Sequence, residues 1–198
     1  MAANIHPIFD NMLDRKAKEG LLKQQAIVIW MTGLSGSGKS TLARGLEQKL
    51  HSNGVLTKLL DGDNLRTGLN KNLGFSEEDR VENIRRVAET AKLFLDNGVF
   101  TICSFVSPTR ALRNMAKEII GEGDFLEIFV ASSFDECTKR DVKGLYKKAL
   151  DGEIKDFTGL DAPFDIPENP FLNIDTEKLT VEESTDLLYQ NVIKKIKQ

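Results

Sequence analysis

Apolar residues along the chain gather in short runs that alternate with longer stretches of helical spacing. The runs are rich in β-branched residues, which is typical of buried strands in a parallel sheet. They predict strands at 27–31, 55–60, 99–105, 125–130 and 171–174. The stretches between them predict helices at 10–24, 39–52, 76–96, from 107 onward, 133–140 and 181–196. This alternation predicts an α/β fold in three layers, with helices on both faces of a parallel sheet of about five strands.

Capping residues set the expected starts of these helices. Asp10 is expected to cap the first helix. Ser76 is followed by three acidic residues, which favour a helix start because they complement the helix dipole. Ser107 stands before a proline, and proline suits the first helical turn. Ser132 or Ser133 is expected to cap the helix after the fourth strand.

One internal segment breaks the alternation. Residues 142–170 contain several glycines and prolines and give few regular signals. A long irregular stretch inside a compact domain is often a lid over an active site, although a surface loop without a role is the alternative. We therefore expect an N-terminal arm and helix at 1–25, and a single domain at 26–198 that carries a lid at about 142–170.

Composition and charge narrow the class of protein. The 198 residues are 40% hydrophobic, enough for a sizeable core, and carry a net charge of -3. Because a general nucleic-acid binder shows a basic excess, nucleic acid is not an expected partner. Two cysteines far apart in sequence fit a reduced, cytoplasmic protein. No apolar stretch reaches membrane-spanning length, and the first ten residues lack the layout of a signal peptide.

The strongest motif follows the first predicted strand. Residues 33–40 read G-L-S-G-S-G-K-S and match the phosphate-loop pattern G-x-x-x-x-G-K-[ST]. The glycines allow successive N–H groups to surround an anion, and the following helix adds its positive end. A chance glycine-rich turn is the alternative, which the strand and helix on either side disfavour. We expect ATP to bind at Gly33, Leu34, Ser35, Gly36, Ser37, Gly38, Lys39, Ser40 and Thr41, with Lys39 at the β- and γ-phosphates and Ser40 on Mg²⁺.

The residues after the second strand indicate what is done with the triphosphate. Residues 70–73 begin like the base-reading motif of a switch GTPase but lack its Asp. The strands at 99–105 and 125–130 lack the terminal carboxylate of a motor ATPase. The second strand instead ends at Asp61 and Asp63, which suits a small-molecule kinase, because acidic groups there can orient an acceptor hydroxyl or hold Mg²⁺. Alternatively, Asp63 caps a short helix.

Cationic and aromatic residues indicate a second substrate. Arg66 and Arg80 lie on either side of Phe75 and suggest a pocket for a second anion. Phe75 and Phe157 can each stack on a planar ring. The alternatives are that the arginines belong to a solvated surface and that the phenylalanines belong to the core.

These features together resemble adenylyl-sulfate kinase. The Asp-Gly-Asp-Asn, Lys-Gly-Leu-Tyr and Phe-Thr-Gly blocks carry the resemblance most specifically. The matching blocks follow one another in the family's order at 32–41, 60–66, 68–76, 79–80, 83–86, 104–108, 141–149, 152–159 and 161–163. The resemblance implies the P-loop NTPase fold, the stand-alone form of the kinase and a tendency to form homodimers. It also implies transfer of the ATP γ-phosphate, with Mg²⁺, to the 3′-hydroxyl of adenylyl sulfate.

The resemblance also assigns residues. It implies catalytic roles for Lys39, Asp61, Asp63 and Ser107, and it places Ser40 and Asp61 at the metal. It places Arg140 on the ATP side, and implies that adenylyl sulfate is bound by Asp61, Asp63, Asn64, Arg66, Phe75, Arg80, Asn83, Lys143, Leu145 and Phe157. Serine at position 107 is linked in this family to a phosphoryl-enzyme, but in-line transfer needs no covalent intermediate, so a helix cap or substrate contact is favoured.

Two alternatives to this function stay open. One is another small-molecule P-loop kinase, acting for example on a nucleoside or a sugar acid. Such an enzyme would not need Phe75 and Phe157 together with Arg66 and Arg80. The other is a nucleotide sensor without catalysis, which the intact phosphate-loop lysine and strand-end carboxylates disfavour.

Overall fold

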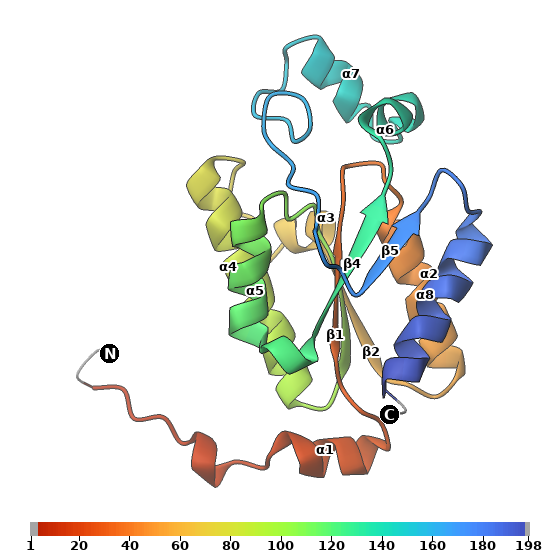
Figure 1. The fold of residues 1–198 in the computed structure, drawn as a ribbon. Helices are drawn as coiled ribbons and strands as arrows, with labels where there is room; N and C mark the ends of the chain where they lie inside the picture. Colours follow the sequence, from red (N-terminus) through yellow and green to blue (C-terminus); the bar gives the residue numbers. More distant parts are fainter. Residues whose placement is uncertain (1–3, 197–198) are drawn as a thin grey trace.

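The computed structural model describes residues 4–196, and its centre is a five-stranded sheet with the order β2-β3-β1-β4-β5 (Figure 1). Every pair of neighbouring strands is parallel. The strands span Val28–Thr32 (β1), Thr57–Asp61 (β2), Phe100–Ser104 (β3), Phe125–Ala131 (β4) and Leu172–Asp175 (β5). The predicted α/β fold and all five predicted strands are confirmed, with ends shifted by one or two residues.

Helices cover both faces of the sheet, as predicted. On one face lie α4 (Glu77–Asp96) and α5 (Arg110–Ile120), and on the other α2 (Lys39–Ser52) and α8 (Val181–Ile196) (Figure 1). The fully buried strand β1 serves both faces, because successive side chains of a strand point in opposite directions. Trp30 joins the α4–α5 core, whereas its neighbours Ile29 and Met31 join the α2–α8 core.

Two of the predicted caps are wrong. Helix α1 (Arg15–Leu22) is capped by Asp14, whose carboxylate accepts from the Ala17 N–H at 2.8 Å, whereas Asp10 lies in the short 3₁₀ turn η1 (Phe9–Asn11). Helix α5 is capped by Thr109, not Ser107. Proximity to the following proline misled the sequence interpretation. The caps predicted at Ser76 (α4) and Ser133 (α6, Phe134–Arg140) are confirmed.

The segment 142–170 is more ordered than its composition suggests. It contains a helix, α7 (Leu145–Leu150), which begins where the Asp141 carboxylate accepts from the N–H groups of residues 146 and 147 at 3.0 Å. The rest of the segment consists of turns and irregular chain, as its glycines and prolines predict. The segment forms a small core of its own together with the phosphate loop and α6, built from Leu34, Cys137, Tyr146, Ala149 and Phe157.

The N-terminal helix docks at the end of the sheet opposite the phosphate loop. Arg15 of α1 pairs with Asp124 at 2.7 Å, just before β4 begins. Gln24 donates to the carbonyls of Leu56 and Gly98, which precede β2 and β3. The chain before this helix extends away from the domain (Figure 1). Exposed apolar side chains follow one another along it at Ile5, Ile8, Phe9, Met12 and Leu13.

The remaining short elements are α3 (Gly62–Arg66) directly after β2, and a 3₁₀ turn at Glu122–Asp124. Across residues 4–196, each helix is either too short or too polar to span a bilayer.

Candidate active site

Residues 33–38 form the predicted phosphate loop between β1 and α2. Gly33, Gly36 and Gly38 have φ values of +152°, +77° and +103°, where side chains are strained. A Cβ on Gly33 would lie 2.5 Å from the Val130 carbonyl oxygen, so this position admits only glycine. Within residues 4–196, the buried Ser37 hydroxyl has no hydrogen-bond partner. Such an unpaired polar group beside a ring of backbone N–H groups fits an anion-binding loop.

Lys39 opens α2 and turns its ammonium group back over this loop. Its Nζ donates to the carbonyls of Gly33 at 2.9 Å and Leu34 at 2.7 Å, and the residue is only 8% exposed. Burial lowers the pKa of Lys39 from 10.5 to about 8, partly offset by the carboxylates of Asp61 and Asp63. The ammonium therefore lies where a bound phosphate would meet it.

The lowered pKa of Lys39 predicts how stability depends on pH. The unfolded lysine keeps a pKa near 10.5, so between pH 8 and 10.5 the unfolded chain binds more protons than the folded chain. The free energy of unfolding should therefore rise with pH across this window relative to that of Lys39→Met. Chemical denaturation of both proteins measures the difference, and a difference that stays flat from pH 7.5 to 10 would contradict the burial of this charge.

Ser40 and Asp61 are the predicted metal residues, and they lie together where α2 begins and β2 ends. The Ser40 hydroxyl donates to Asp61 Oδ2 at 2.7 Å and lies 3.3 Å from the hydroxyl of Ser104, a neighbour that the sequence did not indicate. The described chain holds no cluster of three or more His, Cys, Asp or Glu side chains that could bind a metal. One hydroxyl and one carboxylate suit Mg²⁺, which keeps several waters and binds mainly through substrate phosphates.

The two carboxylates after β2 have separate places. Asp61 caps α3, because its Oδ1 accepts from the Asp63 N–H at 3.1 Å. The alternative that Asp63 is the cap is therefore wrong, since a cap precedes its helix and Asp63 already lies inside it. The Asp63 carboxylate instead contacts the Lys143 ammonium of the lid. Asn64, the next predicted substrate residue, is exposed on the same helix.

Arg66 and Phe75 form one unit on the acceptor side. One terminal nitrogen of Arg66 donates to the carbonyls of Leu73 and Gly74, both at 3.0 Å. The guanidinium carbon lies 4.2 Å from the centre of the Phe75 ring, and Phe75 is 64% exposed. Burial and the nearby charge of Arg80 lower the pKa of Arg66. One face of the ring is therefore covered by a cation, and a planar ligand would stack on the other.

Asn83 is buried below this unit, on α4. Its side-chain oxygen accepts from Asn70 Nδ2 at 2.9 Å. In the described chain the buried Asn70 Oδ1 has no partner. Asn70 begins the segment 70–73, which lacks the Asp of a GTPase base-reading motif. Its position inside the family block 68–76 was the signal that could have found it.

The two predicted stacking rings are not paired in this structure. Phe157 is 9% exposed and packs edge-on against Tyr146, with ring centres 4.9 Å apart and an angle of 78°. Leu145 packs into the same lid core. The expectation that Phe157 offers an open ring beside Phe75 is thus wrong for this arrangement, because the lid's own core covers the ring.

The structure places Ser107 inside the protein. Its hydroxyl accepts from Trp30 Nε1 at 3.0 Å, the residue is 2% exposed, and its φ is +43°. Arg113 donates to its carbonyl at 2.9 Å. Neither the cap role nor an exposed nucleophile matches this environment. The left-handed backbone at a serine is strained, and such strain is held in place by the surrounding contacts.

Arg140 reaches the phosphate loop through one intermediate residue. It donates to the Thr176 hydroxyl at 3.2 Å and to the Thr176 carbonyl at 2.9 Å. The Thr176 hydroxyl in turn donates to the Ser37 carbonyl at 2.9 Å. Thr176 directly follows β5, and no sequence motif indicated it. This chain of contacts puts Arg140 on the predicted ATP side of the loop.

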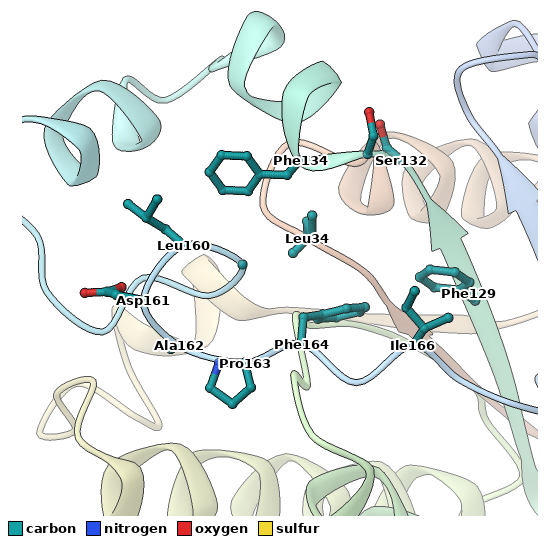
Figure 2. A pocket seen from close by; sticks show the side chains of 12 residues that line it. Leu34, Phe129, Ser132, Phe134, Leu160, Asp161, Ala162, Pro163, Phe164 and Ile166 are labelled. Carbon is teal, nitrogen blue, oxygen red and sulfur yellow. The ribbon is translucent and has the colours of Figure 1, made fainter.

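A cavity of about 520 Å³ lies between the phosphate loop, the end of β4, the start of α6 and lid residues 159–166 (Figure 2). Its wall is mainly apolar, with Phe129 and Phe164 stacked 6.1 Å apart. Among the described residues, Leu34 is the predicted site residue that lines it. The acceptor residues on α3 and α4 lie outside this cavity.

The fold and this site define a class. A parallel sheet with a phosphate loop, a serine–carboxylate pair beside its lysine and a second cationic surface under a lid is the arrangement of a P-loop phosphotransferase.

Comparisons with known proteins give the family. A model of the family described as adenylylsulphate kinase matches residues 25–175, so the chain belongs to that family. An adenylyl-sulfate kinase of Bacteroides thetaiotaomicron is 58% identical over 98% of this chain and 97% of its own length. The structure of the Mycobacterium tuberculosis APS kinase CysC in complex with AMPPNP and APS has a TM-score of 0.80 and 41% identity, covering 88% of this chain and 99% of the other. A hexameric APS kinase from Thiobacillus denitrificans has a TM-score of 0.66 and 32% identity, over 86% of this chain and 29% of the other.

Proposed function

We propose that this kinase transfers the γ-phosphate of ATP to the 3′-hydroxyl of adenylyl sulfate, giving 3′-phosphoadenylyl sulfate. The observation that carries the proposal is the Arg66–Phe75 unit with Arg80 beside it. An open aromatic face next to cationic side chains fits a ligand that joins a purine to an anionic group. The M. tuberculosis relative was solved in complex with AMPPNP and APS, which supports the same pair of ligands here.

The residues of the phosphate loop hold the transferring group. Lys39 and the loop N–H groups neutralise charge on the β- and γ-phosphates and align them for in-line attack. Ser40 and Asp61 would hold Mg²⁺ together with the phosphates, and the ion would supply further neutralisation of that charge. Arg140 and Thr176 fix the loop from the nucleotide side.

The Asp63 carboxylate is the group in this chain that can orient the acceptor. It lies at the carboxyl end of the sheet, beside Asp61 and close enough to Lys39 to influence its charge. Once Lys143 turns from Asp63 to the acceptor's anion, Asp63 Oδ2 can accept the hydrogen bond of the 3′-hydroxyl. The closed lid keeps water from the γ-phosphate.

The 3′-deoxy analogue of adenylyl sulfate tests the position of transfer. It should bind and compete with adenylyl sulfate but release no ADP, because the attacking oxygen is absent. ADP release at the rate of the parent acceptor would place the transfer on another hydroxyl.

We further propose a homodimer in which the N-terminal arm contacts the second copy. The arm exposes five apolar side chains within ten residues, and apolar side chains gathered at the surface are typical of an interface: Ile5, Ile8, Phe9, Met12 and Leu13. For the full chain, light scattering should give twice the chain mass of 22.1 kDa. After deletion of residues 4–13, it should give the mass of a single shortened chain. A monomer with the arm intact would contradict this.

The free, buried Cys103 and Cys137 are consistent with a cytoplasmic protein.

A further inference from the structure

The guanidinium group of Arg80 forms hydrogen bonds with two segments that are far apart in sequence. Its Nε donates to the Phe75 carbonyl at 2.9 Å. One terminal nitrogen donates to the Thr158 hydroxyl at 2.9 Å, and the other donates to the Asp156 carbonyl. Three of its five N–H donors are thus used inside the chain, on the loop at residues 73–76, which we call the acceptor loop, and on the lid.

The lid turn that Arg80 contacts also has hydrogen bonds of its own. The Asp161 carboxylate accepts from the N–H of Asp156 at 2.9 Å and from the N–H of Phe157. The Phe157 carbonyl accepts from the N–H groups of residues 160–162. Arg80 therefore binds a preformed turn, and its donors reach the two residues that flank Phe157, whose ring points into the lid core.

The acceptor loop on the other side of Arg80 is equally fixed. Arg66 holds the carbonyls of residues 73 and 74, and the Asp79 carboxylate accepts from the Gly74 N–H at 2.9 Å. The other lid contact to this side, Lys143 with Asp63, joins two side chains that are 51% and 69% exposed. An exposed ion pair stabilises little, because water screens it. The three hydrogen bonds of Arg80 therefore hold the lid to the acceptor loop more strongly than this ion pair does.

We propose that Arg80 is a positioning residue that docks the lid onto the acceptor loop. It thereby fixes the position of the lid turn relative to the acceptor loop, and these two segments form the two sides of the acceptor pocket. In this assignment the acceptor's anion is bound mainly by Arg66 and Lys143. The docking itself does not depend on the identity of the acceptor, whereas its effect on acceptor binding rests on the proposed function.

Hydrogen exchange of residues 153–162 in the chain without acceptor tests the docking directly. Arg80→Gln should speed exchange of the hydrogen-bonded amides there at least about tenfold, because a charge-assisted anchor is lost. Thr158→Val removes one contact without touching the arginine and should give a smaller increase. Arg85→Gln is the matched control on the same helix, since Arg85 is exposed and pairs with glutamates of that helix. Wild-type exchange in both Arg80→Gln and Thr158→Val would overturn the proposal.

Binding of two competing ligands separates docking from anion binding. Adenosine carries the ring without the anion. If Arg80 acts through the lid, Arg80→Gln should therefore weaken the binding of adenosine and the binding of adenylyl sulfate by the same factor. Weaker binding of adenylyl sulfate alone would mean that Arg80 contacts the anion directly, and would overturn the proposal. If wild-type protein fails to bind adenylyl sulfate, the proposed function fails, and the exchange experiment still decides the docking.

Discussion

Lys39→Met is expected to reduce turnover about a thousandfold, the largest single effect that the site predicts. The ammonium group is the cation aimed into the phosphate loop, and preorganised charges at a transferring phosphoryl group contribute on that scale. Steady-state ADP release measures the change. The variant should unfold at the same or a higher temperature, because the buried ammonium is held with a lowered pKa.

Lys49→Met is the matched control for this loss. Lys49 lies on the same helix and pairs with Asp186 at the surface of the protein. Its replacement should leave turnover unchanged. A turnover of Lys39→Met within tenfold of the wild type would mean that the lysine does not act on the transferring group, and would favour a different catalytic cation.

Phe75→Ala is expected to raise the KM for adenylyl sulfate about 10- to 100-fold and to leave the KM for ATP unchanged. A stacked base contributes roughly 1–3 kcal/mol, and Phe75 offers its free ring face on the acceptor side only. Initial rates at varied concentrations of each substrate separate the two values.

Phe75→Leu separates stacking from apolar contact at the same position. Leucine keeps an apolar side chain but has no ring, so it should recover only a small part of the affinity. An equal rise in both KM values, or full recovery by leucine, would remove the stacking assignment.

The strongly patterned parts of this molecule could be predicted from the sequence. Helix α2 and helix α8 begin and end at the predicted residues, because the phosphate loop and a continuous amphipathic stretch define them. The phosphate loop itself combines a motif with a strand and a helix, so its local structure follows from residues that are neighbours in sequence. The family resemblance placed Ser40 and Asp61 at one metal site, and their side chains are in contact.

The parts that depend on contacts between distant segments could not be predicted. Thr176 meets the phosphate loop across 139 residues, and Arg80 meets Thr158 across 78. The covering of Phe157 by Tyr146 follows from a small lid core, and irregular composition gave no sign of that core. Ser107 was misjudged because its left-handed backbone is imposed by Trp30 and Arg113, which lie elsewhere in the chain.

The proposed function depends above all on adenylyl sulfate being the phosphate acceptor. The most direct measurement is ADP release from ATP and Mg²⁺ with four acceptors in parallel: adenylyl sulfate, adenosine monophosphate, a nucleoside and a sugar acid. We expect rapid turnover with adenylyl sulfate, and no turnover above the rate without acceptor for the other three. Turnover with another of these acceptors and none with adenylyl sulfate would contradict the acceptor assignment while leaving the kinase fold in place.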